Sequence, residues 1–260
     1  MTSVKSLYEK QGYHVFRRLI SDDLIDTFNT VYDSLVKPHR HPLLRQSAQW
    51  DQHHFDEHGA MTNPLLNSHL HPSPVFSDFT TATLDIGCSQ ALQDALVAIS
   101  GSNEFCLMQT MIFEQAVTPP HQDWYYLDSL PHGHLNSAWI ALEDIHQDAA
   151  HFFVIPESID FLTLLPKELI KHQQRYEEKM WEVIRENYGG NIVRPEMKKG
   201  DVIVWNSRLI HGSTGGSDAS KTRRSMTAAY LPAGLAFGNQ FQQQSGPIFM
   251  KLPHQAMSYA

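Results

Sequence analysis

The hydrophobic and polar residues of this chain alternate with two different periods. A helical period follows Ser21 and Ser89, which are suitable N-cap residues, and Gly101 is a suitable C-cap for the second helix. Many short strands with flanking helices indicate a mainly β fold, a double-stranded β-helix of the jelly-roll or cupin-like barrel type. A period of two predicts these strands at residues 13–16, 105–113, 120–127, 137–145, 152–155, 191–196, 201–205 and 223–231.

Three segments interrupt this pattern within what the length predicts to be a single domain, residues 1–260. Residues 38–85 lack a clear period, and we interpret them as a lid or substrate loop because so long a loop is usually functional. Their seven histidines favour a solvated loop over a second metal site. Apolar residues at every fourth position predict an inserted helix at 166–188, and Gly, Gln and Pro predict an irregular tail at 233–260.

Composition and charge exclude several classes of partner. The formal net charge is −8 and no block of Lys and Arg is present, so neither nucleic acid nor a membrane is an expected partner. The N-terminus lacks an apolar signal region, and no run approaches the roughly eighteen apolar residues of a spanning helix. We therefore expect a cytoplasmic protein. Cys88 and Cys106 have apolar neighbours and are interpreted as buried free thiols.

The motif His-x-Asp occurs at residues 54–56, 121–123 and 146–148, and only the second lies between strand-like and aromatic flanks. On an extended strand, His121 and Asp123 point to the same face. A third ligand, His211, would complete a 2-His-1-carboxylate triad, which holds Fe(II) and leaves positions open. From spacing and context alone, a polar strand end with a surface histidine is as good an interpretation as a metal site.

Several ordered motifs resemble the phytanoyl-CoA dioxygenase family of iron- and 2-oxoglutarate-dependent oxygenases. The resemblance covers most of residues 5–232, and one departure is the DAAH and PES segments, where the family commonly has a glycine-containing turn and Gly-Ser-His. That departure affects local turns and leaves the ligands unchanged. Besides His-x-Asp, the motifs that carry the resemblance are YEKQGY at 8–13, AWIALED at 138–144, KKGDVIVW at 198–205, LIHGS at 209–213 and RRSM at 223–226.

The resemblance implies a reaction and its cofactors. Fe(II) would be held by His121, Asp123 and His211, with 2-oxoglutarate and O₂ as cosubstrates. An unactivated C–H bond of a small-molecule metabolite would be hydroxylated or otherwise oxidised, and 2-oxoglutarate decarboxylated to succinate and CO₂. Because the histidines bind metal in their neutral form, acid should weaken iron binding.

The resemblance also implies contacts to 2-oxoglutarate. Ser213 is the expected hydroxyl donor, and Trp139, at the family's offset from the motif, is expected to wall the cosubstrate pocket. Trp139 is interpreted equally well as an ordinary core aromatic. Met111 and Gln109 point into the barrel if their strand alternates, although Gln109 can instead satisfy a neighbouring backbone amide.

An arginine suits the far carboxylate of 2-oxoglutarate, because its guanidinium donates two parallel hydrogen bonds and stays charged when buried. Arg223 and Arg224 are adjacent on a predicted strand and point to opposite faces. The next residues on the face of Arg223 are small or polar and suit a ligand-lined interior. Those on the face of Arg224 could pack the sheet against outer helices. We therefore assign the carboxylate to Arg223, in agreement with the family pattern. A register slip of one residue would reverse this choice.

Substrate contacts are expected from the aromatic residues Trp124, Tyr125 and Tyr126, which directly follow the motif, and from Arg40 in the lid segment. For Trp124, a role in the hydrophobic core is an alternative. Other functions of the same barrel are a metal-dependent isomerase, a cupin-like metal-binding protein, or a halogenase. Asp123 argues against a halogenase, which needs a small residue at that position to admit chloride.

Overall fold

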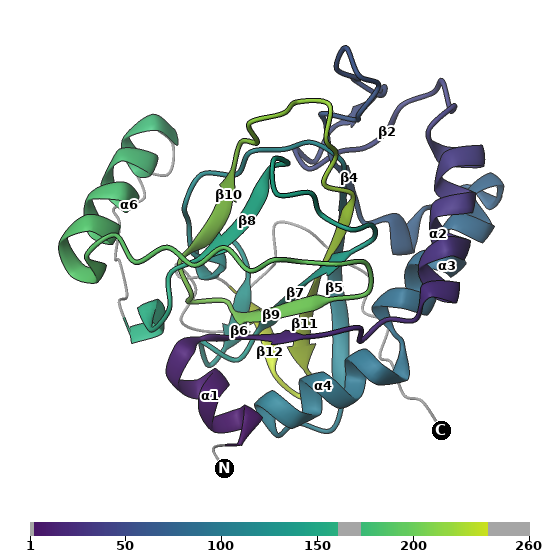
Figure 1. Cartoon of the computed structure of the whole chain (residues 1–260). Coiled ribbons are helices and arrows are strands. Elements are labelled where there is room, and N and C mark those ends of the chain that lie inside the picture. Colours follow the sequence, from purple (N-terminus) through teal and green to yellow (C-terminus); the bar gives the residue numbers. More distant parts are fainter. Residues whose placement is uncertain (1–2, 161–172, 239–260) are drawn as a thin grey trace.

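The computed structural model describes residues 3–160 and 173–238 of the chain. Its centre is a six-stranded antiparallel sheet, which crosses the middle of the molecule in Figure 1. Strands that are far apart in sequence lie side by side in this sheet. From one edge to the other they are β1 (Tyr13–Phe16), β9 (Val202–Asn206), β7 (Asn136–Ala141), β11 (Ser225–Pro232), β5 (Phe105–Phe113) and β4 (Leu65–Leu66).

Shorter antiparallel pairs complete the β structure. Phe152 of one such pair is buried with Trp139 and Trp205 from the inner face of the six-stranded sheet, so the two layers enclose one interior. This arrangement confirms the predicted mainly β barrel. The pairs are β10 (His211–Thr214) with β8 (His151–Val154), β12 (Ala236–Gly238) with β6 (Asp128–Leu130), and β2 (Leu43–Leu44) with β3 (Trp50–Asp51).

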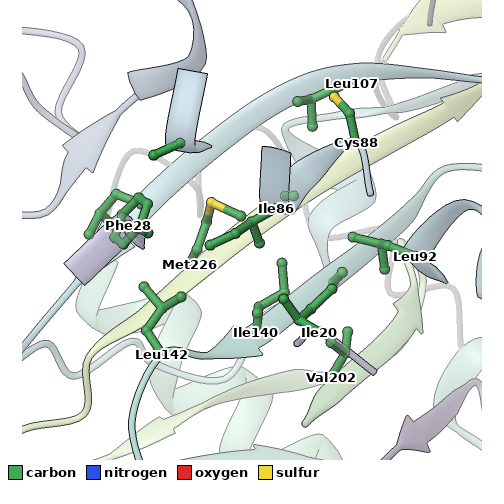
Figure 2. Close-up of a cluster of buried hydrophobic side chains, with 14 of the residues drawn as sticks. Ile20, Phe28, Ile86, Cys88, Leu92, Leu107, Ile140, Leu142, Val202 and Met226 are labelled. Carbon is green, nitrogen blue, oxygen red and sulfur yellow. The ribbon is translucent and has the colours of Figure 1, made fainter. Parts of the chain in front are cut away.

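Helices cover the outer face of the six-stranded sheet (Figure 1). Strand alternation sends Ile140, Val202 and Met226 to this face, where they are buried with Phe28 and Ile86 from the helices (Figure 2). These contacts form the main hydrophobic core. The covering helices are α1 (Val4–Gln11), α2 (Asp22–Val31) with its π-helical extension η1 (Tyr32–Val36), α3 (Ser77–Gly87) and α4 (Gln90–Ser100), and short 3-10 turns are η2 (Ser68–Leu70), η3 (Pro74–Phe76), η4 (Asp123–Tyr125) and η5 (Ser158–Asp160).

Helix α6 (Gln173–Tyr188) lies away from the other helices, beside β8 and β10 (Figure 1). Its residues Tyr176, Met180 and Ile184 are buried against Phe153 and Ile210. The inserted helix predicted at 166–188 is thus present from residue 173, and residues 166–172 lie outside the described residues. None of the described helices combines the length and apolar character that a membrane span requires.

Some predicted elements differ from the structure. Residues 38–85 contain most of α3, which the sequence pattern did not reveal because Thr83 lies on its buried face among apolar residues. The strand predicted at 191–196 is reduced to a single bridge at Val193, and the predicted tail begins with the strand β12. Tail residues 239–260 lie outside the described residues.

A buried carboxylate joins several of these elements. Glu114, which follows β5, is fully buried and accepts hydrogen bonds from Arg224 at 2.8 Å and Lys37 at 3.1 Å. It also accepts one from the backbone N–H of Met61 at 2.8 Å. Arg224 also donates hydrogen bonds to Asp33 of η1, at 3.0 and 2.8 Å. The cluster therefore ties β11, β5, the loop at Met61 and the outer helices together on the outside of the barrel.

The buried His69 makes the stability of the fold sensitive to acid. It is 3% exposed, its Nδ1 lies 2.8 Å from Thr110 Oγ1, and burial lowers its pKa from 6.5 to about 4. As pH falls, the unfolded chain therefore binds the proton before the folded chain does. The contribution of neutral His69 to the free energy of unfolding is fully present above about pH 6.5 and declines towards pH 4. We expect this group to contribute up to roughly 3 kcal/mol to that decline.

Urea unfolding at pH 7 and pH 4.5 measures this contribution. His69→Asn keeps a polar group near the Nδ1 position and removes the titration, so its loss of stability between the two pH values should be smaller than that of the wild type. Equal losses in both proteins would contradict the assignment.

Candidate metal centre

Two distant segments bring three ligating side chains together. Asp123 Oδ1 lies 3.5 Å from His121 Nε2 and 3.4 Å from His211 Nε2. All three ligand atoms are within 4.8 Å of one another, and no other group of three His, Cys, Asp or Glu side chains in the described residues converges in this way. The grouping predicted from the His-x-Asp motif and His211 is therefore formed.

The backbone explains why the side chains converge. Gln122 is extended, with φ −118° and ψ 133°, so its neighbours His121 and Asp123 point to one side while it points to the other. There its amide oxygen accepts a hydrogen bond from Trp124 Nε1 at 3.1 Å. The strand predicted at 120–127 is reduced to an isolated bridge at His121, because Asp123 begins the 3-10 turn η4. His121 and Asp123 nevertheless share one face, because a single extended residue between them is sufficient.

The two histidines are joined through their backbones. His121 N–H donates to the carbonyl of His211 at 2.9 Å, and His211 N–H donates back to the carbonyl of His121 at 3.0 Å. This antiparallel bridge places the imidazole rings with their centroids 4.3 Å apart. The separation of two ligands that are remote in sequence is therefore fixed by main-chain hydrogen bonds.

Both imidazoles are oriented for metal binding. His121 Nδ1 lies 2.8 Å from the carbonyl of Pro119, and His211 Nδ1 lies 3.0 Å from that of Leu209. A carbonyl only accepts, so each Nδ1 carries the proton and each Nε2 presents its lone pair towards Asp123. This is the tautomer that a metal ligand requires.

Electrostatics favour the same protonation states. Burial opposes ionisation of Asp123, but the neighbouring His211 and His121 outweigh it and hold the pKa of this carboxyl well below its usual range. Burial lowers the pKa of His211, and the charge of Asp123 only partly offsets this. The site thus offers the Nε2 atoms of two imidazoles and one carboxylate, a donor set that fits Fe(II).

A cavity opens beside these ligands, and a buried arginine lines it. Arg223 is 2% exposed, and its Nη2 donates to the carbonyl of Ala116 at 2.8 Å and lies 3.5 Å from Ser213 Oγ. Its Nε is buried without a hydrogen-bond partner among the described residues. Burial lowers the pKa of Arg223 to about 10, so the guanidinium stays charged at neutral pH. An unpaired buried donor on a cation fits a carboxylate ligand.

Arg224 has a different environment. It points to the outer side of β11, where it binds Glu114 and Asp33 and lies over the ring of Tyr32 at 4.9 Å. The following residues Met226, Ala228 and Tyr230 belong to the main hydrophobic core under the helices. The opposite faces predicted for the two arginines are thus observed.

The other predicted cosubstrate residues, Trp139, Ser213, Met111 and Gln109, all line the cavity. Thr227 lines it too, as its shared face with Arg223 predicted. Phe152, Trp205 and Ser137 also line it but were not predicted, although strand alternation places the last two on the inner face. Gln46, from the long loop at 38–85, reaches the cavity as well, and no pattern in that loop indicated it.

The predicted substrate residues lie elsewhere. Trp124 and Tyr125 are buried in the hydrophobic cluster with α6, and Tyr125 packs edge-on against Tyr176. Tyr126 is 52% exposed and Arg40 is exposed, and neither lines the cavity. Their assignment to substrate binding remains a prediction.

A double-stranded β-helix with two histidines and one carboxylate beside an interior cavity defines the class of non-haem iron enzymes that use 2-oxoglutarate. The chain belongs to the phytanoyl-CoA dioxygenase (PhyH) family, whose sequence model it matches over residues 8–225. This family uses Fe(II), 2-oxoglutarate and O₂, and the chain is accordingly an oxygenase with these cofactors.

Solved structures share the fold at low sequence identity. The α-ketoglutarate-dependent epimerase SnoN of nogalamycin biosynthesis is 15% identical, with a TM-score of 0.63 over 96% of this chain and 86% of its own. The carbocyclase SnoK of the same biosynthesis is 13% identical, with a TM-score of 0.66 over 97% and 94%. Iron-bound EctD from S. alaskensis is 17% identical, with a TM-score of 0.62 over 91% and 78%. No curated protein matches the chain in sequence.

Proposed function

We propose that the protein hydroxylates an unactivated C–H bond of a small-molecule metabolite. The observation that carries this proposal is the convergence of His121, Asp123 and His211 beside a cavity that also contains the buried guanidinium of Arg223. When bound, Fe(II) and 2-oxoglutarate supply the oxidising power, as O₂ is consumed and 2-oxoglutarate is decarboxylated to succinate and CO₂. His121, Asp123 and His211 would hold the iron.

Arg223 would bind the far carboxylate of 2-oxoglutarate through its unpaired Nε. The hydroxyl of Ser213 donates to the carbonyl of Ala116 at 3.2 Å and would turn from it to donate to the cosubstrate. Phe113 and Trp139, whose rings lie 5.9 and 6.0 Å from the guanidinium carbon, shield this contact from water. The low local dielectric strengthens the charge pair. Met111 and Gln109 face the same interior and would complete the walls around cosubstrate and substrate.

The rest of the cavity wall favours an uncharged substrate. Among the described residues that line the cavity, Arg223 is the sole Lys or Arg and Asp123 the sole carboxylate, and both are assigned to cosubstrate and metal. Gln46, Gln109 and Thr227 offer neutral hydrogen-bonding groups beside apolar side chains. A charged substrate group would lose hydration here without gaining a partner. The part of the substrate that enters the cavity is therefore inferred to be neutral.

Turnover of 2-oxoglutarate tests the proposal directly. With Fe(II), ascorbate and O₂ but no substrate, the protein should form succinate slowly, and the amount should equal the 2-oxoglutarate consumed. Mass spectrometry of both acids measures this balance, and a chelator should abolish it. Absence of any 2-oxoglutarate binding would favour a cupin-like metal-binding protein instead.

Stimulation of succinate formation then tests the substrate class. Neutral polar metabolites should accelerate turnover, whereas matched carboxylated or phosphorylated analogues should not. Stimulation confined to acyl-CoA thioesters or other anions would overturn the neutral assignment and leave the oxygenase proposal intact.

A further inference from the structure

Asp123 presents its two carboxylate oxygens to different surroundings. Oδ1 faces the two imidazole Nε2 atoms, at 3.5 and 3.4 Å. Oδ2 accepts two hydrogen bonds, from Ser137 Oγ at 2.9 Å and from Trp205 Nε1 at 3.0 Å. The oxygen that faces away from the histidines is therefore fully engaged by the protein.

The two donors come from neighbouring strands of the six-stranded sheet. Ser137 of β7 and Trp205 of β9 are direct cross-strand partners, so their side chains emerge side by side on the inner face. They are 5% and 3% exposed, respectively. Trp205 is also fixed by contacts of its ring with Phe152 at 4.9 Å and with His211 at 4.8 Å. The sheet thus holds this carboxylate at a defined angle.

We propose that Ser137 and Trp205 are positioning residues that make Asp123 a one-oxygen ligand. A carboxylate can bind a metal through one or both oxygens, and the second mode occupies a further coordination position. Hydrogen bonds to Oδ2 oppose rotation of the carboxylate into that mode. The pair thereby keeps open the positions that 2-oxoglutarate needs, an inference that rests on the proposed function.

The consequence differs from that of losing a ligand. Without the two donors, Asp123 still binds metal but competes with 2-oxoglutarate for the same coordination position. Metal affinity should therefore change little, whereas cosubstrate affinity should fall. Loss of a residue that merely stabilises the fold would lower metal affinity and cosubstrate affinity together, or change neither.

Conservative variants separate these effects. Ser137→Ala removes only a hydroxyl, and Trp205→Phe keeps an aromatic ring while removing the indole N–H. A matched control is Ser207→Ala, because Ser207 is equally buried and donates to the buried carboxylate of Asp128 at 2.8 Å. The control removes the same kind of hydrogen bond from a carboxylate outside the metal centre.

The measurement is calorimetric titration of 2-oxoglutarate into nickel-loaded protein, in which no turnover occurs. We expect each single variant to weaken 2-oxoglutarate binding about 3-fold, and the double variant at least about 10-fold, which is the scale of losing one and two hydrogen bonds. Nickel affinity should stay within about 3-fold of the wild type, and Ser207→Ala should bind 2-oxoglutarate normally. If the double variant does not fold, the test rests on comparing each single variant with the control Ser207→Ala.

Failure of this proposal is distinguishable from failure of the proposed function. If the nickel-loaded wild type does not bind 2-oxoglutarate, the cosubstrate assignment itself is wrong, and the positioning role falls with it. If the wild type binds and the double variant binds equally well, only the positioning role is overturned. An equal loss in Ser207→Ala, or a parallel loss of nickel affinity, would also overturn it.

Discussion

His211→Ala should abolish succinate formation while leaving the fold intact. The imidazole supplies one of three ligands, and loss of a group essential to catalysis lowers turnover by at least about three orders of magnitude. The backbone bridge to His121 does not involve the side chain, so it persists in the variant. Asp123 also keeps its hydrogen bonds from Ser137 and Trp205. Activity should therefore be lost without a comparable loss of stability.

The measurement pairs succinate assays with thermal unfolding. His151→Ala is a matched control, because His151 lies on the adjacent strand β8, opposite Thr214 of β10. Its ring Nε2 lies 2.7 Å from a backbone carbonyl, outside the group of three ligands. The control should retain activity. Full activity in His211→Ala would refute the metal centre, and loss of folding in that variant would refute the independence of fold and site.

Arg223→Ala should raise the concentration of 2-oxoglutarate needed for half-maximal activity by one to two orders of magnitude. The reason is the loss of a charged contact worth a few kcal/mol in a buried site. Arg223→Lys should recover only part of the affinity, because an ammonium group cannot donate in the geometry of the guanidinium fork. Calorimetric titration of the nickel-loaded variants gives the same comparison without turnover.

Arg224→Ala is the control for this experiment and should show the opposite behaviour. Its side chain is outside the cavity, so affinity for 2-oxoglutarate should remain near that of the wild type. Its loss leaves the buried Glu114 with fewer positive partners, and stability should fall by roughly 3 kcal/mol, measured by urea unfolding. The reverse pattern in the two variants would identify Arg224 as the carboxylate anchor.

The assignment of these two arginines shows what the sequence predicts well. The period of two in β11 separates Thr227, which lines the cavity, from Met226 in the outer core, and it therefore predicted the direction of Arg223 and Arg224. The same logic placed His121 and Asp123 together. These predictions succeeded because they depend only on local backbone geometry and on burial of one face.

Other features depend on which strands are neighbours, and the sequence alone did not reveal them. Nothing local relates His211 to His121, and spacing and context left their grouping undecided until the family resemblance favoured it. The convergence of Ser137 and Trp205 on Asp123 follows from the register of β7 with β9, which single-chain periodicity does not specify. Gln46 was missed for a similar reason, since a loop without periodicity carries no signal for the direction of its side chains.

The backbone bridge between His121 and His211 bears on how the protein responds to loss of its metal ion. In proteins whose metal site exists only when the metal is bound, removal of the ion unfolds the chain. Here main-chain hydrogen bonds join the two histidines without the help of an ion. We therefore expect the chain to stay folded when a chelator removes the iron, and to bind iron again without refolding.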